Sequence, residues 1–268
     1  MERLIALGTG NAMATRCYNT CFALQSDRTG TLLVDAGGGN GILGRLREAG
    51  IAVRDLHEMI VTHEHCDHIL GTVWIVRAAG SAMLAGSEGD LTIWCHAGLE
   101  KAIRAMCGFT LQKKITDLFD RRIHFSTVAD GTRAMLWGRE FTFFSIHSTK
   151  AEQYGFTAPL ANGAKLVCLG DEPYNEACAP YVQGADWLLS EAFCLYADRD
   201  RFRPYEKHHS TVRDAACLAQ QLGAQHLVLW HTEDSDLAHR KARYTVEAQQ
   251  SCRGEVFVPD DLEVIPLN

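Results

Sequence analysis

Four potential metal ligands lie close together in the segment His63–His68, whose sequence is His-Glu-His-Cys-Asp-His. Imidazole nitrogens and carboxylate oxygens are the usual protein ligands of zinc-class divalent ions. The alternating spacing places His63 and His65 on one side of a tight loop, and Asp67 and His68 follow on the next turn. Such groups are buried together only with a metal or with many polar partners. This segment, called the histidine loop below, therefore predicts a metal site at the start of a helix.

Three further candidate ligands lie far along the chain, each just after an apolar, strand-like run. His147 follows Phe-Phe-Ser-Ile, Asp171 follows Val-Cys-Leu-Gly, and His231 follows Val-Leu-Trp. In α/β folds, polar residues at strand ends converge over a packed core and form the binding site. The repetition predicts that these three side chains meet the histidine loop.

Together these residues would supply the ligands of two divalent ions. One short loop cannot complete two coordination shells, so each ion also needs ligands from distant parts of the chain. The donor types favour zinc and are also compatible with manganese or iron(II). The expected ligands are His63, His65 and His147 at the first ion, Asp67, His68 and His231 at the second, and Asp171 as a bridge between them.

Apolar periodicity predicts the elements that position these ligands. Strand-like runs occur at residues 4–7, 21–24, 31–34, 58–61, 91–95, 141–146, 165–169, 187–189, 226–229 and 255–258. Helical patterns occur at 41–49, 69–83, 99–107, 211–222 and 237–250, and Thr211 with Asp214 forms a capping pattern. Strands that alternate with helices indicate an α/β class. No linker divides the chain, so residues 1–268 are expected to form one domain.

The composition limits the cellular setting and the partners. The net charge of −7 does not indicate a general polyanion-binding surface. No apolar run approaches the roughly 20 residues that span a bilayer, and the N-terminus lacks the pattern of a signal peptide. The ten cysteines are scattered without a CxxC motif, which favours reduced thiols. We therefore expect a soluble cytoplasmic protein that does not bind membranes.

At these motifs the chain resembles the metallo-β-lactamase superfamily, and within it ribonuclease Z, the tRNA 3′-end endonuclease. The resemblance covers nearly the whole chain. The segments that carry it beside the metal ligands are Leu7–Ala12, Arg16–Phe22, Leu33–Gly38, His68–Gly71, Leu91–Trp94, Ser190–Ala192, His209–Thr211 and Leu229–His231. The resemblance implies a four-layer αββα sandwich and hydrolysis of a phosphodiester by a metal-activated water. It also implies a homodimer.

The resemblance further implies roles for individual residues. Asp67 would orient the attacking water or take its proton. His209, held by Glu191, would donate a proton to the departing oxygen or stabilise it. His208 is adjacent in sequence and is an alternative for this role. Asp35 would support the histidine loop.

Two departures from the ribonuclease Z pattern bear on the substrate. Only 23 residues separate His147 from Asp171, where ribonuclease Z carries a flexible arm that grips tRNA. The usual Gly-Asp-Thr is replaced by Gly-Asp-Glu, with Glu172 in the last position. The expected substrate is therefore either an RNA 3′ end, as in tRNA, or a small phosphodiester.

Other functions fit the same metal ligands. A thioesterase or lactonase would use the metal pair to polarise a carbonyl group. A non-catalytic metal-binding or RNA-binding module is a third option, although the complete ligand set argues against it. A flavin-coupled di-iron oxidoreductase is disfavoured, because Asp67 and His68 suit zinc and no flavodoxin-like domain fits in this length.

Overall fold

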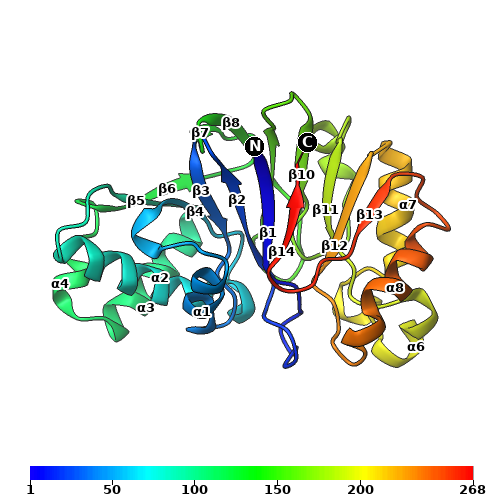
Figure 1. The fold of residues 1–268 in the computed structure, drawn as a ribbon, viewed down its shortest axis with the longest axis horizontal. Helices are drawn as coiled ribbons and strands as arrows, with labels where there is room; N and C mark the ends of the chain where they lie inside the picture. Colours follow the sequence, from blue (N-terminus) through cyan, green and yellow to red (C-terminus); the bar gives the residue numbers. More distant parts are fainter. Residues whose placement is uncertain (268) are drawn as a thin grey trace.

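The computed structural model describes residues 1–267 and contains two seven-stranded sheets that face each other (Figure 1). Across the first sheet the strands are β14 (Glu263–Pro266), β1 (Glu2–Gly8), β2 (Cys21–Ser26), β3 (Gly30–Val34), β4 (Leu56–Ile60), β5 (Leu91–His96) and β6 (Ile123–Val128). Across the second they are β13 (Glu255–Phe257), β12 (His226–Trp230), β11 (Trp187–Glu191), β10 (Lys165–Cys168), β9 (Tyr154–Pro159), β8 (Arg139–Ser145) and β7 (Arg133–Leu136).

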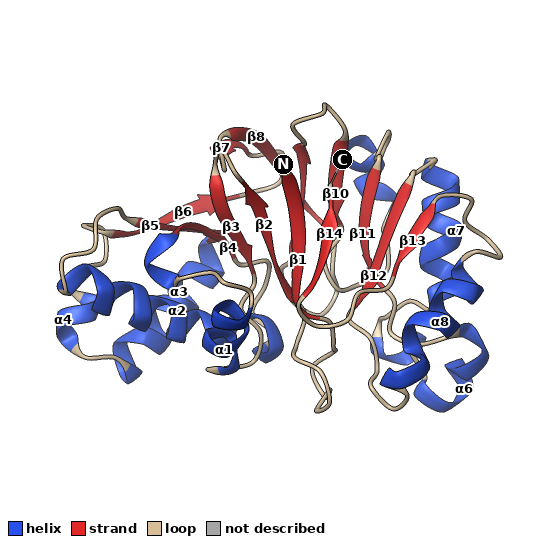
Figure 2. Cartoon of the chain, viewed as in Figure 1, coloured by secondary structure: helices blue, strands red, loops and turns tan. Residues whose placement is uncertain are grey.

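Helices cover the outer face of each sheet (Figure 2). Beside the first sheet lie α1 (Gly41–Glu48), α2 (Cys66–Leu84), α3 (Ala97–Thr110) and α4 (Lys113–Thr116). Beside the second lie α6 (Arg199–Phe202), α7 (Val212–Leu222) and α8 (Leu237–Ala248). The short helix α5 (Ala179–Val182) packs against the same sheet through Val182. Short 3₁₀ turns occur at Val53–Asp55, Glu176–Cys178, Tyr196–Asp198 and Tyr205–Lys207.

Three apolar cores hold the four layers together. Between the sheets, Leu24 of β2 and Phe143 of β8 belong to one buried cluster. A second cluster, which includes Leu33 and Ile75, joins the first sheet to its helices. A third, which includes Leu227 of β12, does the same for the second sheet. This αββα arrangement confirms the predicted fold class.

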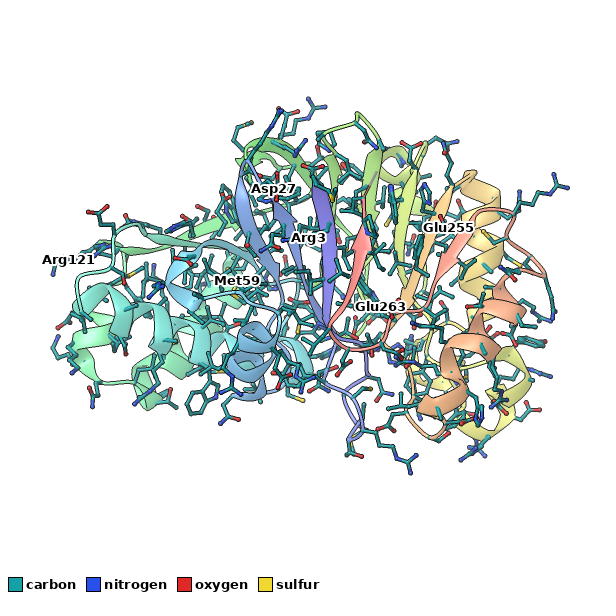
Figure 3. The ribbon with its side chains drawn as sticks, in the orientation of Figure 1. Arg3, Asp27, Met59, Arg121, Glu255 and Glu263 are labelled. Carbon is teal, nitrogen blue, oxygen red and sulfur yellow. The ribbon has the colours of Figure 1, made fainter. Side chains whose placement is uncertain are left out.

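The parallel parts of both sheets direct their strand ends to one edge of the molecule. Strands β3 to β6 run parallel to one another, and so do β10 to β13. The loop that follows β1 (blue) projects below the sheets in Figure 1. In Figure 3, Arg3 of β1 and Glu263 of β14 lie on adjacent strands near the middle of the view, while Arg121 and Glu255 mark opposite sides of the molecule. The loops at this lower edge carry the candidate site.

The ten predicted strands and five predicted helices are all present, with ends displaced by up to three residues. Thr211 and Asp214 form the expected capping box at the start of α7. The strands β6, β7, β9 and β14 were not predicted. Within the described residues, no helix is both long and apolar enough to cross a membrane. All ten cysteines are free thiols.

Gly71 allows α2 to lie directly against the turn after β3. Its amide donates to the Gly37 carbonyl at 2.8 Å, and a Cβ here would overlap the Ala36 carbonyl oxygen. Gly71→Ala is therefore expected to lower the free energy of unfolding by about 1–3 kcal/mol, as overpacking does. The control is Gly44→Ala in α1, where no heavy atom lies within 4 Å. Denaturant unfolding should show a stabilisation of about 0.5–1 kcal/mol for the control, and equal effects would contradict the packing argument.

Candidate metal centre

The histidine loop connects β4 to α2, as its spacing predicted. His65 is the N-cap of α2, with an extended backbone at φ −61° and ψ 143°, and the helix begins at Cys66. Asp67 and His68 lie in the first helical turn, and both are buried. The loop and the turn thus present two successive pairs of ligands, because the backbone changes from extended to helical between them.

A carboxylate oxygen of Asp171 lies in the centre of the cluster. Asp171 Oδ2 is 3.4 Å from His63 Nε2 and 3.9 Å from His65 Nδ1. The same oxygen is 3.5 Å from His68 Nε2 and 3.5 Å from His231 Nε2. One oxygen therefore contacts the imidazoles of both expected ion sites.

The second group of ligands forms around Asp67. Its Oδ2 is 3.3 Å from His231 Nε2 and 3.5 Å from His68 Nε2. Potential ligand atoms of these three residues lie within 4.8 Å of one another, and so do those of His63, His65 and Asp171. Six of the seven predicted ligands are thus brought together in two adjoining groups.

Buried neighbours hold these ligands in place. Asp35, just after β3, accepts hydrogen bonds from the amide and hydroxyl of Thr62, each at 2.8 Å. Asp35 Oδ2 also lies 2.7 Å from His68 Nδ1, so the Nε2 atom of this ring faces the cluster. Gln153 Nε2 donates to Asp171 Oδ1 at 2.7 Å, which leaves Oδ2 to the imidazoles. Such outer contacts set ring orientation and carboxylate position.

The electrostatics of the cluster keep the carboxylates ionised. Burial alone would raise the pKa of Asp171, but His63 and the other imidazoles hold that pKa well below its usual range. Burial would also raise the pKa of Asp67, but the hydrogen bonds and charges of His231 and His68 lower it. Burial lowers the pKa of His63, which favours its neutral form. Burial would lower the pKa of His68 too, yet Asp35 and other carboxylates raise it well above 6.5.

These residues fit a divalent metal. Ionised carboxylates and neutral imidazoles are the forms that bind cations. His68 Nε2 is buried without a hydrogen-bond partner, which is costly for a polar atom unless another group binds it. A cation at this position would satisfy the nitrogen and displace the ring proton.

His147 is the one predicted ligand that the structure does not bring into either group. His147 is exposed, and its main-chain amide donates a hydrogen bond to Ser145 Oγ at 3.2 Å. Its backbone has φ +57°, and this turn directs the chain out of β8. Ligation by His147 therefore remains a prediction.

The strand-end positions around the cluster have strained backbones. Asp35 has φ +55° after β3, and His231 has φ +57° after β12. Non-glycine residues rarely adopt this left-handed region, and such residues cluster at functional sites. The strain occurs at two of the residues that form or support the cluster.

His209 joins the cluster, whereas His208 does not. The Nδ1 atom of His209 is 3.0 Å from the main-chain oxygen of Asp171 and 3.5 Å from Glu191 Oε2. Its ring stacks on Phe193 at 5.0 Å with an interplanar angle of 6°. Glu191 is 1% exposed, and its other oxygen accepts from the Ser210 amide. His208 is exposed, with its Nδ1 3.5 Å from Thr149 Oγ1.

A pocket of about 530 Å³ opens over the cluster. Its walls include site residues that the sequence did not reveal, namely Met13, Lys150, Phe193, Phe202 and Lys207. Gln153 was missed as well. No motif marks these positions. Met13 and Lys150 lie in separate loops, and Phe193, Phe202 and Lys207 lie in the connection between β11 and α7. Cys66 is exposed and also lines the pocket.

The chain is similar to several known proteins over most of its length. It is 28% identical to a ribonuclease Z from Bradyrhizobium sp. (strain ORS 278), in an alignment that covers 86% of this chain and 89% of that protein. The metallo-β-lactamase fold protein YhfI from Bacillus subtilis superposes with a TM-score of 0.80 at 21% identity, covering 98% of both chains. The short form of human tRNase Z gives 0.75 at 20% identity and covers all of both chains.

These similarities confirm the predicted resemblance to ribonuclease Z and the metallo-β-lactamase fold. They also confirm the predicted class of enzyme, a metal-dependent hydrolase. A model of the family described as Anti-Pycsar protein Apyc1 matches residues 2–247, and the chain belongs to that family.

Proposed function

We propose that this protein is a binuclear, metal-dependent phosphodiesterase. The observation that carries the proposal is the position of Asp171 Oδ2, within 3.9 Å of imidazole nitrogens from both ligand groups. A carboxylate in this position suits a bridge between two cations. We propose His63, His65 and Asp171 for the first ion and Asp67, His68, His231 and Asp171 for the second. His147 would complete the first set after a change in its rotamer.

The donor set of nitrogen and carboxylate oxygen favours zinc. When bound, a pair of such ions polarises a phosphoryl oxygen and makes water a stronger nucleophile. The residues of this chain then hold the reacting groups and move protons. Asp67, ionised and buried beside His231, orients the attacking water or accepts its proton.

His209 is proposed to protonate the departing oxygen. Its Nδ1 is fixed by the Asp171 carbonyl, so the ring presents Nε2 as the free nitrogen. Glu191 Oε2, buried 3.5 Å from the same Nδ1 atom, also holds the ring in this orientation. The stack on Phe193 restricts rotation of the ring.

Two features favour a small phosphodiester over tRNA. The pocket of about 530 Å³ has the size of a small-molecule site. Between β8 and β10 the chain forms only a loop and β9, so no long arm extends from this part of the described structure. An RNA 3′ end remains the second candidate, supported by the resemblance to ribonuclease Z.

One assay series tests the proposal. The metal-loaded enzyme is given bis-p-nitrophenyl phosphate, a dinucleotide, a cyclic nucleotide, a 3′-extended pre-tRNA and an acyl thioester under the same conditions. We expect hydrolysis of small diesters that a chelator abolishes and added zinc restores. Turnover of the thioester alone would favour the carbonyl hydrolase, and no turnover with two ions bound would favour a binding module.

We also propose a homodimer in the cytoplasm. Free cysteines suit a reducing compartment. Trp74 and Phe109, 37% and 92% exposed, border an apolar groove of about 540 Å³ between α2 and α3, a surface that suits a second copy of the chain. Sedimentation velocity measures this directly, and a monomer at high concentration would contradict it.

A further inference from the structure

The loop after β8 carries a lysine to the wall of the pocket. The loop bends at Ser148, whose hydroxyl oxygen accepts from the amides of Lys150 at 3.1 Å and Ala151 at 3.2 Å. The same hydroxyl donates to Glu172 Oε1 at 2.7 Å. The bend is therefore anchored on Glu172, the residue that follows Asp171.

Glu172 needs a positive charge nearby. It is 7% exposed, and burial of an unpaired carboxylate is costly. Lys150 Nζ lies 3.5 Å from Glu172 Oε1 and supplies that charge. Glu172 stands where the ribonuclease Z pattern has threonine, a shorter side chain without charge. Glu172 in place of threonine therefore forms an ion pair that sets the position of Lys150.

The ammonium group of Lys150 retains an N–H donor that can bind a ligand. It donates to the main-chain oxygen of Lys207 at 3.0 Å, which joins the loop to the segment that carries His209. An ammonium has three N–H donors, of which the hydrogen bond to Lys207 uses one and the ion pair with Glu172 uses at most a second. The side chain is 26% exposed and lines the pocket beside Asp171 and His209.

Lys207, the other lysine of the pocket, is placed differently. Its Nζ lies over the Phe193 ring, 4.9 Å from the ring centre. Two acids, Glu233 and Asp234, line the pocket as well. Lys150 is thus the lysine of the pocket whose ammonium is positioned by a hydrogen bond and an ion pair.

We propose that Lys150 binds an anionic oxygen of the phosphodiester substrate and that Glu172 positions it. This proposal rests on the proposed function. Lys150 would use its remaining N–H for a charge-assisted hydrogen bond, and Glu172 would keep the ammonium at the pocket wall. Glu172 does not touch the substrate, so it acts as a positioning residue.

The test compares Lys150→Ala, Lys150→Arg and Glu172→Gln with Lys101→Ala, an exposed lysine of α3. Bound metal, the melting temperature, kcat and KM for bis-p-nitrophenyl phosphate, and the Kd of inorganic phosphate by calorimetry are measured for each. Lys150→Ala should raise KM and the phosphate Kd about tenfold or more and change kcat less. Lys150→Arg should restore both constants to within a few-fold. Glu172→Gln, which keeps the shape, should raise both constants several-fold, and Lys101→Ala should change neither.

Unchanged KM and phosphate Kd in Lys150→Ala, with normal metal content, would overturn the proposal. A lower melting temperature with unchanged constants would also overturn it, since it would reveal a purely structural tether. Should the wild type hydrolyse no diester, the proposed function fails, and the phosphate Kd still decides the role of Lys150.

Discussion

Asp171→Asn is expected to lower turnover about a thousandfold or more and to leave fewer than two metal ions per chain. The substitution keeps the shape of the side chain and removes the charge that contacts four imidazoles. Metal-ion catalysis supplies several kcal/mol of stabilisation, and each 1.36 kcal/mol corresponds to about a factor of ten in rate. Elemental analysis of the purified variant and its steady-state rate measure both effects.

The control for this substitution is Asp55→Asn, at an exposed carboxylate before β4. It should retain two ions and wild-type turnover. If Asp171→Asn also kept two ions and normal activity, Asp171 would have no role as a bridge.

His209→Ala is expected to slow hydrolysis of a diester with a ribose leaving group by about 10²–10⁴-fold, the usual contribution of a general acid. Bound metal should stay at the wild-type level, because the proposed ligands do not include His209. Hydrolysis of bis-p-nitrophenyl phosphate should fall much less, since p-nitrophenolate leaves without a proton. The ratio of the two rates therefore reports proton donation.

His208→Ala is the matched control for His209→Ala, because its ring is exposed and adjacent in sequence. It should behave as the wild type on both substrates. An equal loss on both substrates in His209→Ala, or a loss of metal, would contradict the role of proton donor.

The sequence predicts most of this fold because its core strands are apolar and its helices amphipathic. The ten predicted runs include the central strands β3, β11 and β12, each of which contains at least three consecutive buried apolar residues. The missed strands are edge or hairpin strands. In β7 and β14 exposed residues interrupt the apolar pattern. The pairing of β14 also depends on β1, a partner distant in sequence.

The candidate site could be predicted where a rule of topology applies. Asp171 and His231 follow parallel strands, whose ends meet at one edge, and both reach the histidine loop. His147 follows β8, which pairs antiparallel with its neighbours, and its side chain is exposed. Gln153 and Lys150 could not be predicted, because their positions depend on loop hydrogen bonds that leave no periodic signal.

The most direct measurement is anomalous scattering from a crystal of the zinc-loaded protein, combined with metal analysis in solution. The account predicts two ions per chain and two anomalous peaks, one beside His63 and His65 and one beside Asp67, His68 and His231, with Asp171 between them. A single peak, or peaks away from Asp171, would contradict it.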